Sequence, residues 1–170
     1  MVAKIIRVAD EYDALVHKRH YTTHVHITET LKELIKDANP TNYAPTIALS
    51  QLSENSKVGK ISPRILKALF KVVIDDILYE ISSLIDYLQY LRDNIKRLEL
   101  IGNYSKKMDK SHSQKKKDYF KEGMQMLLQS GETLDNYTQI LKEYKDALKI
   151  RQDRINALYN EIKLIKRLKV

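Results

Sequence analysis

The segment Ser62 to Ile101, SPRILKALFKVVIDDILYEISSLIDYLQYLRDNIKRLELI, decides the fold of this 170-residue chain. From its middle onward, apolar residues recur at alternating steps of four and three, which places them on one side of a helix. Such an apolar stripe must be covered by other helices, so the segment predicts a helical domain. The stripe consists of Ile77, Ile81, Leu84, Leu88, Leu91, Ile95 and Leu98.

Local signals predict where the helices of this region begin and end. Ser62-Pro63 is typical of an N-cap followed by proline at the first helical position. Ser82-Ser83 predicts a bend, and Gly102-Asn103 predicts a helix end. The polar run from Tyr104 to Lys117 then predicts an exposed loop.

The C-terminal region predicts two further helices. The first runs to about Gly131, and the second begins near Thr133 and continues for about thirty residues or more. Because a partner of ordinary size cannot cover so long a helix, we expect its distal half to pack on another subunit. The residues expected at partner interfaces are Ile77, Ile81, Leu84, Leu88, Leu91, Ile155, Leu158, Ile162 and Ile165.

The N-terminal region has a different composition. Val2 to Val8 is β-branched and apolar, and Asp13 to Ile27 contains an alternating run, so both predict strands joined by a turn. Thr30 begins a capping-box pattern that predicts a helix of about ten residues, ending at Asn39-Pro40. The predicted fold is therefore mainly α, with a small ββ(β)α module in residues 1–40, a polar linker in 41–61, and a helical bundle with a long C-terminal helix in 62–170.

Composition favours long helices in a cytoplasmic protein. Four glycines and three prolines are few for 170 residues, and the absence of cysteine excludes disulfides and thiolate metal sites. No apolar run reaches the roughly 18 residues of a membrane span, and the first residues lack a signal-peptide pattern. We therefore expect no contact with a membrane.

The net charge of +8 is concentrated toward the C-terminus. Residues 1–103 contain 14 basic and 13 acidic residues, whereas residues 104–170 contain 16 and 9. This excess suits nucleic acid, although lysines also keep helix surfaces solvated. Tyr104 and Tyr119 flank the densest basic run, and their rings can stack on bases. The candidate nucleic-acid contacts are Lys106, Lys107, Lys110, Lys115, Lys116 and Lys117.

No motif in the sequence indicates catalysis, so we expect neither an enzyme nor a cofactor. Glycine-rich nucleotide-binding patterns are absent. Asp75 and Asp76 are adjacent on a helix and point about 100° apart, which makes them a poor acid and base pair. The densest group of possible metal ligands lacks flanking carboxylates, so we assign no metal site. This group is His17, His20, His24 and His26.

Three segments resemble subunits of the GINS replication complex. Val25 to Thr28, followed by the short helix Thr30 to Asp37, is similar to the strand and helix that end their small domain. Leu91 to Leu98, LRDNIKRL, is similar to their L-R-x-x-K-[IL] segment, and Ser111 to Phe120 resembles their T-x-E-E-x-x-x-[FY] helix. The order resembles that of the archaeal two-three-type subunit, in which a small β-containing domain precedes the helical domain.

This resemblance implies a non-catalytic scaffold in DNA replication. It implies that the protein joins a second GINS-type subunit in a two-plus-two tetramer, which bridges the replicative helicase and partner proteins. Two alternatives from other classes stay open. One is a basic helical nucleic-acid-binding protein, viral or plasmid-encoded, and the other is a self-associating coiled-coil structural protein.

Overall fold

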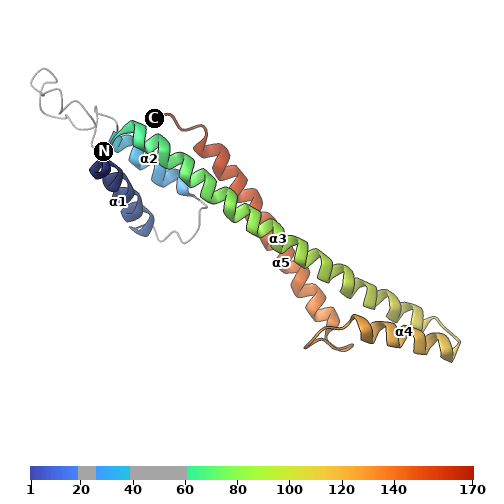
Figure 1. The fold of residues 1–170 in the computed structure, drawn as a ribbon. Helices are drawn as coiled ribbons and strands as arrows, with labels where there is room; N and C mark the ends of the chain where they lie inside the picture. Colours follow the sequence, from blue (N-terminus) through green and yellow to red (C-terminus); the bar gives the residue numbers. More distant parts are fainter. Residues whose placement is uncertain (19–25, 39–60) are drawn as a thin grey trace, which may run out of the picture. The chain divides into compact units, whose positions relative to one another are not determined.

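The computed structural model describes residues 1–18, 26–38 and 61–170, and these contain five helices and no strand (Figure 1). The described chain divides into two compact units, 1–81 with 156–170 (unit 1) and 82–155 (unit 2). Two of the helices contribute residues to both units. The helices are α1 (Val2–Lys18), α2 (Ile27–Ala38), α3 (Pro63–Asp109), α4 (Gln114–Leu127) and α5 (Tyr137–Ile165).

The mainly helical character is confirmed, but the predicted N-terminal strands are wrong, because Val2 to Lys18 is one helix. Val8, Tyr12 and Leu15 follow one another at steps of four and three, and all three are buried or half-buried. This helical period continues through the predicted turn, which contains neither glycine nor proline to end a helix. Of the second predicted strand, residues 13–18 belong to α1, residues 19–25 lie outside the described part, and Ile27 begins α2.

The helix α2 begins three residues before its predicted cap, Thr30. His26 precedes it with a φ of 72°, and a residue from α5 then supplies the cap. The buried Glu161 carboxylate accepts a hydrogen bond of 2.5 Å from the backbone N–H of Thr28. This amide lies in the first turn and has no acceptor within its own helix, so the carboxylate satisfies it and complements the helix dipole. The helix α2 is described to Ala38, and the predicted stop at Asn39-Pro40 lies outside the described residues.

Unit 1 is held together by apolar side chains from α1, α2, the N-terminal part of α3 and the C-terminal part of α5. Tyr12 of α1 lies near Asp76 of α3, and burial, followed by the charge of Asp76, raises the pKa of the tyrosine to about 12. The fold therefore favours the neutral phenol at this helix contact. The buried apolar residues of unit 1 are Val8, Ile27, Leu31, Leu34, Ala38, Ile61, Leu66, Phe70, Val73, Ile77, Ile81, Leu158, Ile162 and Ile165.

The helix α3 is continuous over 47 residues. It begins at Pro63 as predicted, and the backbone N–H of Leu66 donates to the carbonyl of Ser62 at 2.9 Å. The helix continues through Ser82 and Ser83 without a break, since both serines are exposed and neither interrupts the apolar stripe. The end predicted at Gly102 is wrong. A Cβ at this glycine would lie 3.8 Å from the Tyr137 hydroxyl, so packing by α5 covers the position.

Unit 2 combines the C-terminal part of α3 with α4 and the N-terminal part of α5. Its core is a cluster of Leu98, Ile101 and Met124, with tyrosines and leucines packed around it. The predicted loop of residues 104–117 is reduced to residues 110–113, since α3 continues to Asp109 and α4 begins at Gln114. In the part of the chain that is described, no helix is both long and apolar enough to cross a membrane.

The connection from α4 to α5 differs from the prediction by a few residues. The helix α4 ends at Leu127 rather than near Gly131, and α5 begins at Tyr137 with a length of 29 residues. Thr133, the predicted cap, makes a reciprocal pair with Asn136. The Asn136 N–H donates to Thr133 Oγ1 at 3.2 Å, and the Thr133 N–H donates to Asn136 Oδ1 at 2.7 Å. The threonine thus orders the turn that leads into α5.

Gly123 of α4 lies against the ring of Tyr104 of α3. A Cβ at this glycine would be 2.9 Å from Tyr104 Cε2, which is closer than real side chains approach. The ring is also held by Phe120, whose centroid lies 5.8 Å away. Glycine therefore sets how closely α3 and α4 approach each other.

We expect Gly123→Ala to destabilise the protein by about 1 kcal/mol, because overpacking outweighs the gain in helix propensity. The matched control is Gly102→Ala, another helical glycine. Its added methyl group makes only ordinary contact with Tyr137, so this variant should gain about 0.5–1 kcal/mol from helix propensity. Urea unfolding followed by circular dichroism measures both changes. Equal changes in the free energy of unfolding of the two variants would show that the contact with Tyr104 does not limit how closely α3 and α4 approach each other.

Candidate functional site

The six predicted nucleic-acid contacts lie at one end of unit 2, where α3 turns into α4 (Figure 1). Lys106 and Lys107 belong to the last turn of α3, Lys110 to the connecting turn, and Lys115 to Lys117 to the first turn of α4. Five are exposed, and Lys117 is half-buried. The fold thus joins two separate lysine runs into one surface, which we call the lysine end.

The lysine end is a concentrated positive charge. Residues 104–121 contain seven lysines and two aspartates, so they supply +5 of the net charge of +8. One of these carboxylates, Asp118 Oδ1, accepts a hydrogen bond of 2.8 Å from Gln114 Nε2. Among the described residues, the six lysines form no ion pair. Their charge is therefore available to an external anion.

Helix dipoles act differently on the two halves of the lysine end. Lys106 and Lys107 lie at the negative C-terminus of α3, which stabilises them. Lys115 to Lys117 lie at the positive N-terminus of α4, which has no acidic residue in its first turn. A lysine there costs a few tenths of a kcal/mol. A bound anion would remove this repulsion, because it would meet both the lysines and the dipole with opposite charge.

The two tyrosines of the predicted site have different surroundings. Tyr104 is half-buried against Gly123 and serves the packing of α3 on α4. Tyr119 is 66% exposed, and its ring meets Phe120 edge to face with centroids 5.5 Å apart. A surface groove of about 310 Å³ lies beside these rings. Only Tyr119 is therefore available to stack on a ligand.

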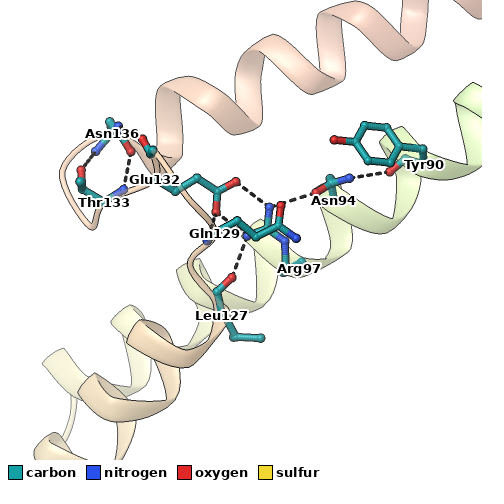
Figure 2. A network of polar contacts seen from close by, with 9 residues as sticks. Tyr90, Asn94, Arg97, Leu127, Gln129, Glu132, Thr133 and Asn136 are labelled. Atoms are coloured by element: carbon teal, nitrogen blue, oxygen red, sulfur yellow. Dashed lines mark hydrogen bonds and ion pairs between the residues drawn. The ribbon is translucent and has the colours of Figure 1, made fainter.

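A polar network anchors α4 and the turn after it to α3 (Figure 2). The Arg97 guanidinium donates two hydrogen bonds to the Glu132 carboxylate, of 2.5 and 2.6 Å. It also donates to the backbone carbonyl of Leu127, at the last turn of α4, at 2.7 Å, and to Asn94 Oδ1 at 3.0 Å. The amide of Asn94 in turn donates to the Tyr90 carbonyl at 2.9 Å. No local sequence pattern predicts this network, because the bonds from Arg97 to Leu127 and Glu132 join residues that are 30 and 35 positions apart.

The ion pair in this network is largely shielded from water. Only 15% of the Arg97 side chain and 6% of the Glu132 side chain are exposed. The hydrogen bond from Arg97 is the main cause that lowers the pKa of Glu132, and a bond from the Gln129 N–H at 2.8 Å adds to it. The same pairing raises the pKa of Arg97. Both groups are therefore held in their charged forms.

The predicted interface residues lie in the interior of the single chain. Eight of the nine are buried, and Leu84 is half-buried. They form parts of the two cores, which leaves almost no surface on them for another subunit. Unit 1 contains Ile77, Ile81, Leu158, Ile162 and Ile165, and unit 2 contains Leu84, Leu88, Leu91 and Ile155.

The two described histidines of the predicted group lie in different segments. His17 is exposed on α1, with Nδ1 3.2 Å from Asp13 Oδ1, and His26 is exposed in the turn before α2. His20 and His24 lie outside the described residues. Within residues 1–18, 26–38 and 61–170, no group of three or more histidine or acidic side chains could hold a metal ion.

Unit 1 also has a surface groove, of about 590 Å³, between α1 and the start of α3. Its lining is mainly apolar, with Lys4 and Arg64 as the charged members. The described residues that line it include no carboxylate or imidazole, so they provide no acid and base pair.

No family model matches the chain, and comparisons with curated proteins and with solved structures gave no match. The resemblance to GINS subunits therefore stays a prediction. The structure around two of the resembling segments differs from the expected one. Ile27 and Thr28 begin a helix instead of ending a strand, and Leu91 to Leu98 lies inside α3, which continues to Asp109. Function has to be argued from the lysine end.

The Arg97 network should make the stability of unit 2 depend on pH. A carboxyl group with a lowered pKa stabilises the fold at pH values above its unfolded pKa, ordinarily 4.5. This contribution is lost as the pH falls through the folded pKa. We expect Glu132→Gln to lower the free energy of unfolding by about 1–3 kcal/mol near neutral pH, because a buried guanidinium loses its counter-charge. Urea unfolding at about pH 7 and about pH 3 should show the deficit shrinking in acid.

Glu99→Gln is the matched control for this measurement. Glu99 pairs with Lys145 at 2.7 Å, but about half of each side chain is exposed, 47% and 50%. Solvent screening should limit the loss to about 0.5 kcal/mol or less. A Glu132→Gln variant as stable as Glu99→Gln at neutral pH would contradict a stabilising role for the buried pair.

Proposed function

We propose that this protein binds nucleic acid through the lysine end of unit 2. The observation that carries the proposal is the joining of two separate lysine runs into one exposed surface without ion pairs among the described residues. The helix dipole favours the lysines at the end of α3 but disfavours those at the start of α4, so it does not account for lysines on both sides of the turn. Phosphates along a nucleic-acid backbone present negative charge at short, regular intervals and match such a surface.

The proposed binding is electrostatic and largely independent of sequence. Each lysine that neutralises a phosphate releases condensed counterions, and this release drives association. Six such contacts correspond to a slope of about −4 to −5 in a plot of log affinity against log salt concentration. Lysine ammonium groups act as point charges and do not read base edges in the way that bidentate arginine does. The protein therefore serves as a non-catalytic binding module.

The resemblance to GINS subunits supports a narrower proposal, in which the chain is a scaffold that bridges the replicative helicase and partner proteins. A site for nucleic acid would suit such a protein. The narrower proposal takes second place, because it depends on an order of domains, strands before helices, that the described residues do not have.

Replacing Lys115, Lys116 and Lys117 by glutamine tests the proposal. We expect affinity for a fluorescent single strand of about 20 nucleotides to fall by at least tenfold near 100 mM salt, and the salt slope to lose about two to three units. Removing lysines from the N-terminus of α4 should also stabilise this helix by a few tenths of a kcal/mol. Fluorescence anisotropy between about 50 and 200 mM salt measures the binding.

The matched control replaces Lys163, Lys166 and Lys169, three exposed lysines near the C-terminus of α5, by glutamine. It removes the same charge from another surface, so affinity should stay within about twofold of the unmodified protein. Equal losses in the two variants would mean that net charge alone, and not the lysine end, attracts nucleic acid. A salt-independent affinity would overturn the proposal altogether.

A further inference from the structure

We infer that the lysine end takes single-stranded nucleic acid, with one unpaired base stacked on Tyr119 in the groove beside it. This inference rests on the proposed function and specifies the class of nucleic acid. Its basis is the placement of an exposed aromatic ring and a small groove on the same helix as lysines that form no ion pair with another described residue.

Tyr119 shares a face of α4 with two of the lysines. Lys115 and Lys116 precede it by four and three residues, and positions so spaced are neighbours on a helix surface. Glu122 and Met126 follow it by three and seven residues on the same face, and both line the groove. One face of α4 thus carries cations, an aromatic ring, a carboxylate and an apolar edge, in that order along the helix. A nucleotide offers a phosphate and a base in the same arrangement.

The ring of Tyr119 is supported on one side by another ring, although it is largely exposed. Its edge-to-face contact with Phe120, at 68° between the planes, fixes its environment on one side. Phe120 is in turn packed on Tyr104, whose ring contacts Gly123. The exposed tyrosine therefore packs against a cluster of aromatic side chains. It loses little conformational freedom when a ligand stacks on it.

The volume and the lining of the groove determine which part of a nucleic acid can enter it. Its volume, about 310 Å³, is at the lower end of the range for small-molecule sites, which suits one base and not a duplex. Glu122 places a carboxylate in the lining, where it can accept a hydrogen bond from an exocyclic amino group and repels phosphate. The backbone of a bound strand would therefore follow the lysines while a base enters the groove.

This arrangement discriminates against duplex nucleic acid. In a duplex, the faces of the bases are covered by their stacked neighbours, and phosphates alone remain for the lysines. Single strands expose base faces, and each base stacked on an aromatic ring contributes to affinity in a way that hardly depends on sequence. The lysine end then binds both forms, whereas Tyr119 strengthens binding of the single strand only.

The test measures binding of the full chain to a fluorescent single strand and to the duplex of the same length by anisotropy, at several salt concentrations. The variants are Tyr119→Ala and Tyr119→Phe, with Tyr159→Ala on α5 as the control for an exposed tyrosine. We expect Tyr119→Ala to weaken single-strand binding about 5- to 100-fold, with duplex affinity within twofold and the salt slope unchanged. Tyr119→Phe and the control should bind like the unmodified protein, and circular dichroism confirms that each variant is folded.

The outcomes separate this inference from the proposed function. Equal binding of single strand and duplex, unaffected by Tyr119→Ala but lost when Lys115 to Lys117 become glutamine, overturns the stacking inference and leaves the proposed function intact. An absence of binding to either form overturns both. Stacking is supported if Tyr119→Ala lowers affinity for the single strand alone and Tyr119→Phe leaves it unchanged. Phenylalanine keeps the ring and removes only the hydroxyl.

Discussion

The apolar stripe of α3 must be covered along the whole of a 47-residue helix, and this requirement places the other helices. In unit 1, side chains such as Leu66 and Ile77 are fully buried beneath α1, α2 and the end of α5, and in unit 2 Leu91 and Leu98 are fully buried with α4 and the start of α5. At about 25 cal/mol per Å² of apolar surface, an uncovered stripe of this length could not be tolerated in water. The other helices therefore bury the apolar stripe of one long helix.

The lysine end depends on the packing and hydrogen bonds that hold α4 on α3. The helix α4 has 14 residues, no acidic residue in its first turn and three lysines at its positive end, so its isolated stability is low. Three interactions with α3 compensate: the burial of Met124, the close contact of Gly123 with Tyr104, and the hydrogen bond from Arg97 to the Leu127 carbonyl. The lysines at the N-terminus of α4 would destabilise an isolated helix. The contacts of α4 with α3 offset this cost.

Periodicity in the sequence predicted α3, the helix after Thr30 and the two C-terminal helices, since each buries a stripe with helical spacing. At Val2 to Val8, the β-branched composition predicts a strand, whereas the helical period that continues to Tyr12 and Leu15 predicts a helix. The structure follows the helical period. Gly102 did not end α3, because burial against Tyr137 outweighs the cost of a helical glycine of about 1 kcal/mol. The lysines were visible as a run, but their union across a turn and the Arg97 pair with Glu132 depend on contacts between distant residues, which no local pattern contains.

Asn94 holds the side chain of Arg97, and the contacts of Arg97 align the helices of unit 2. Asn94 is only 6% exposed within an otherwise apolar stripe. Leucines that repeat every three or four residues would still be buried if one helix slid along another by a turn, so they permit several registers. Such a slide would separate Arg97 from Glu132 and from the carbonyl of Leu127, and leave buried polar atoms without partners. These polar residues select one register among those that the leucines allow.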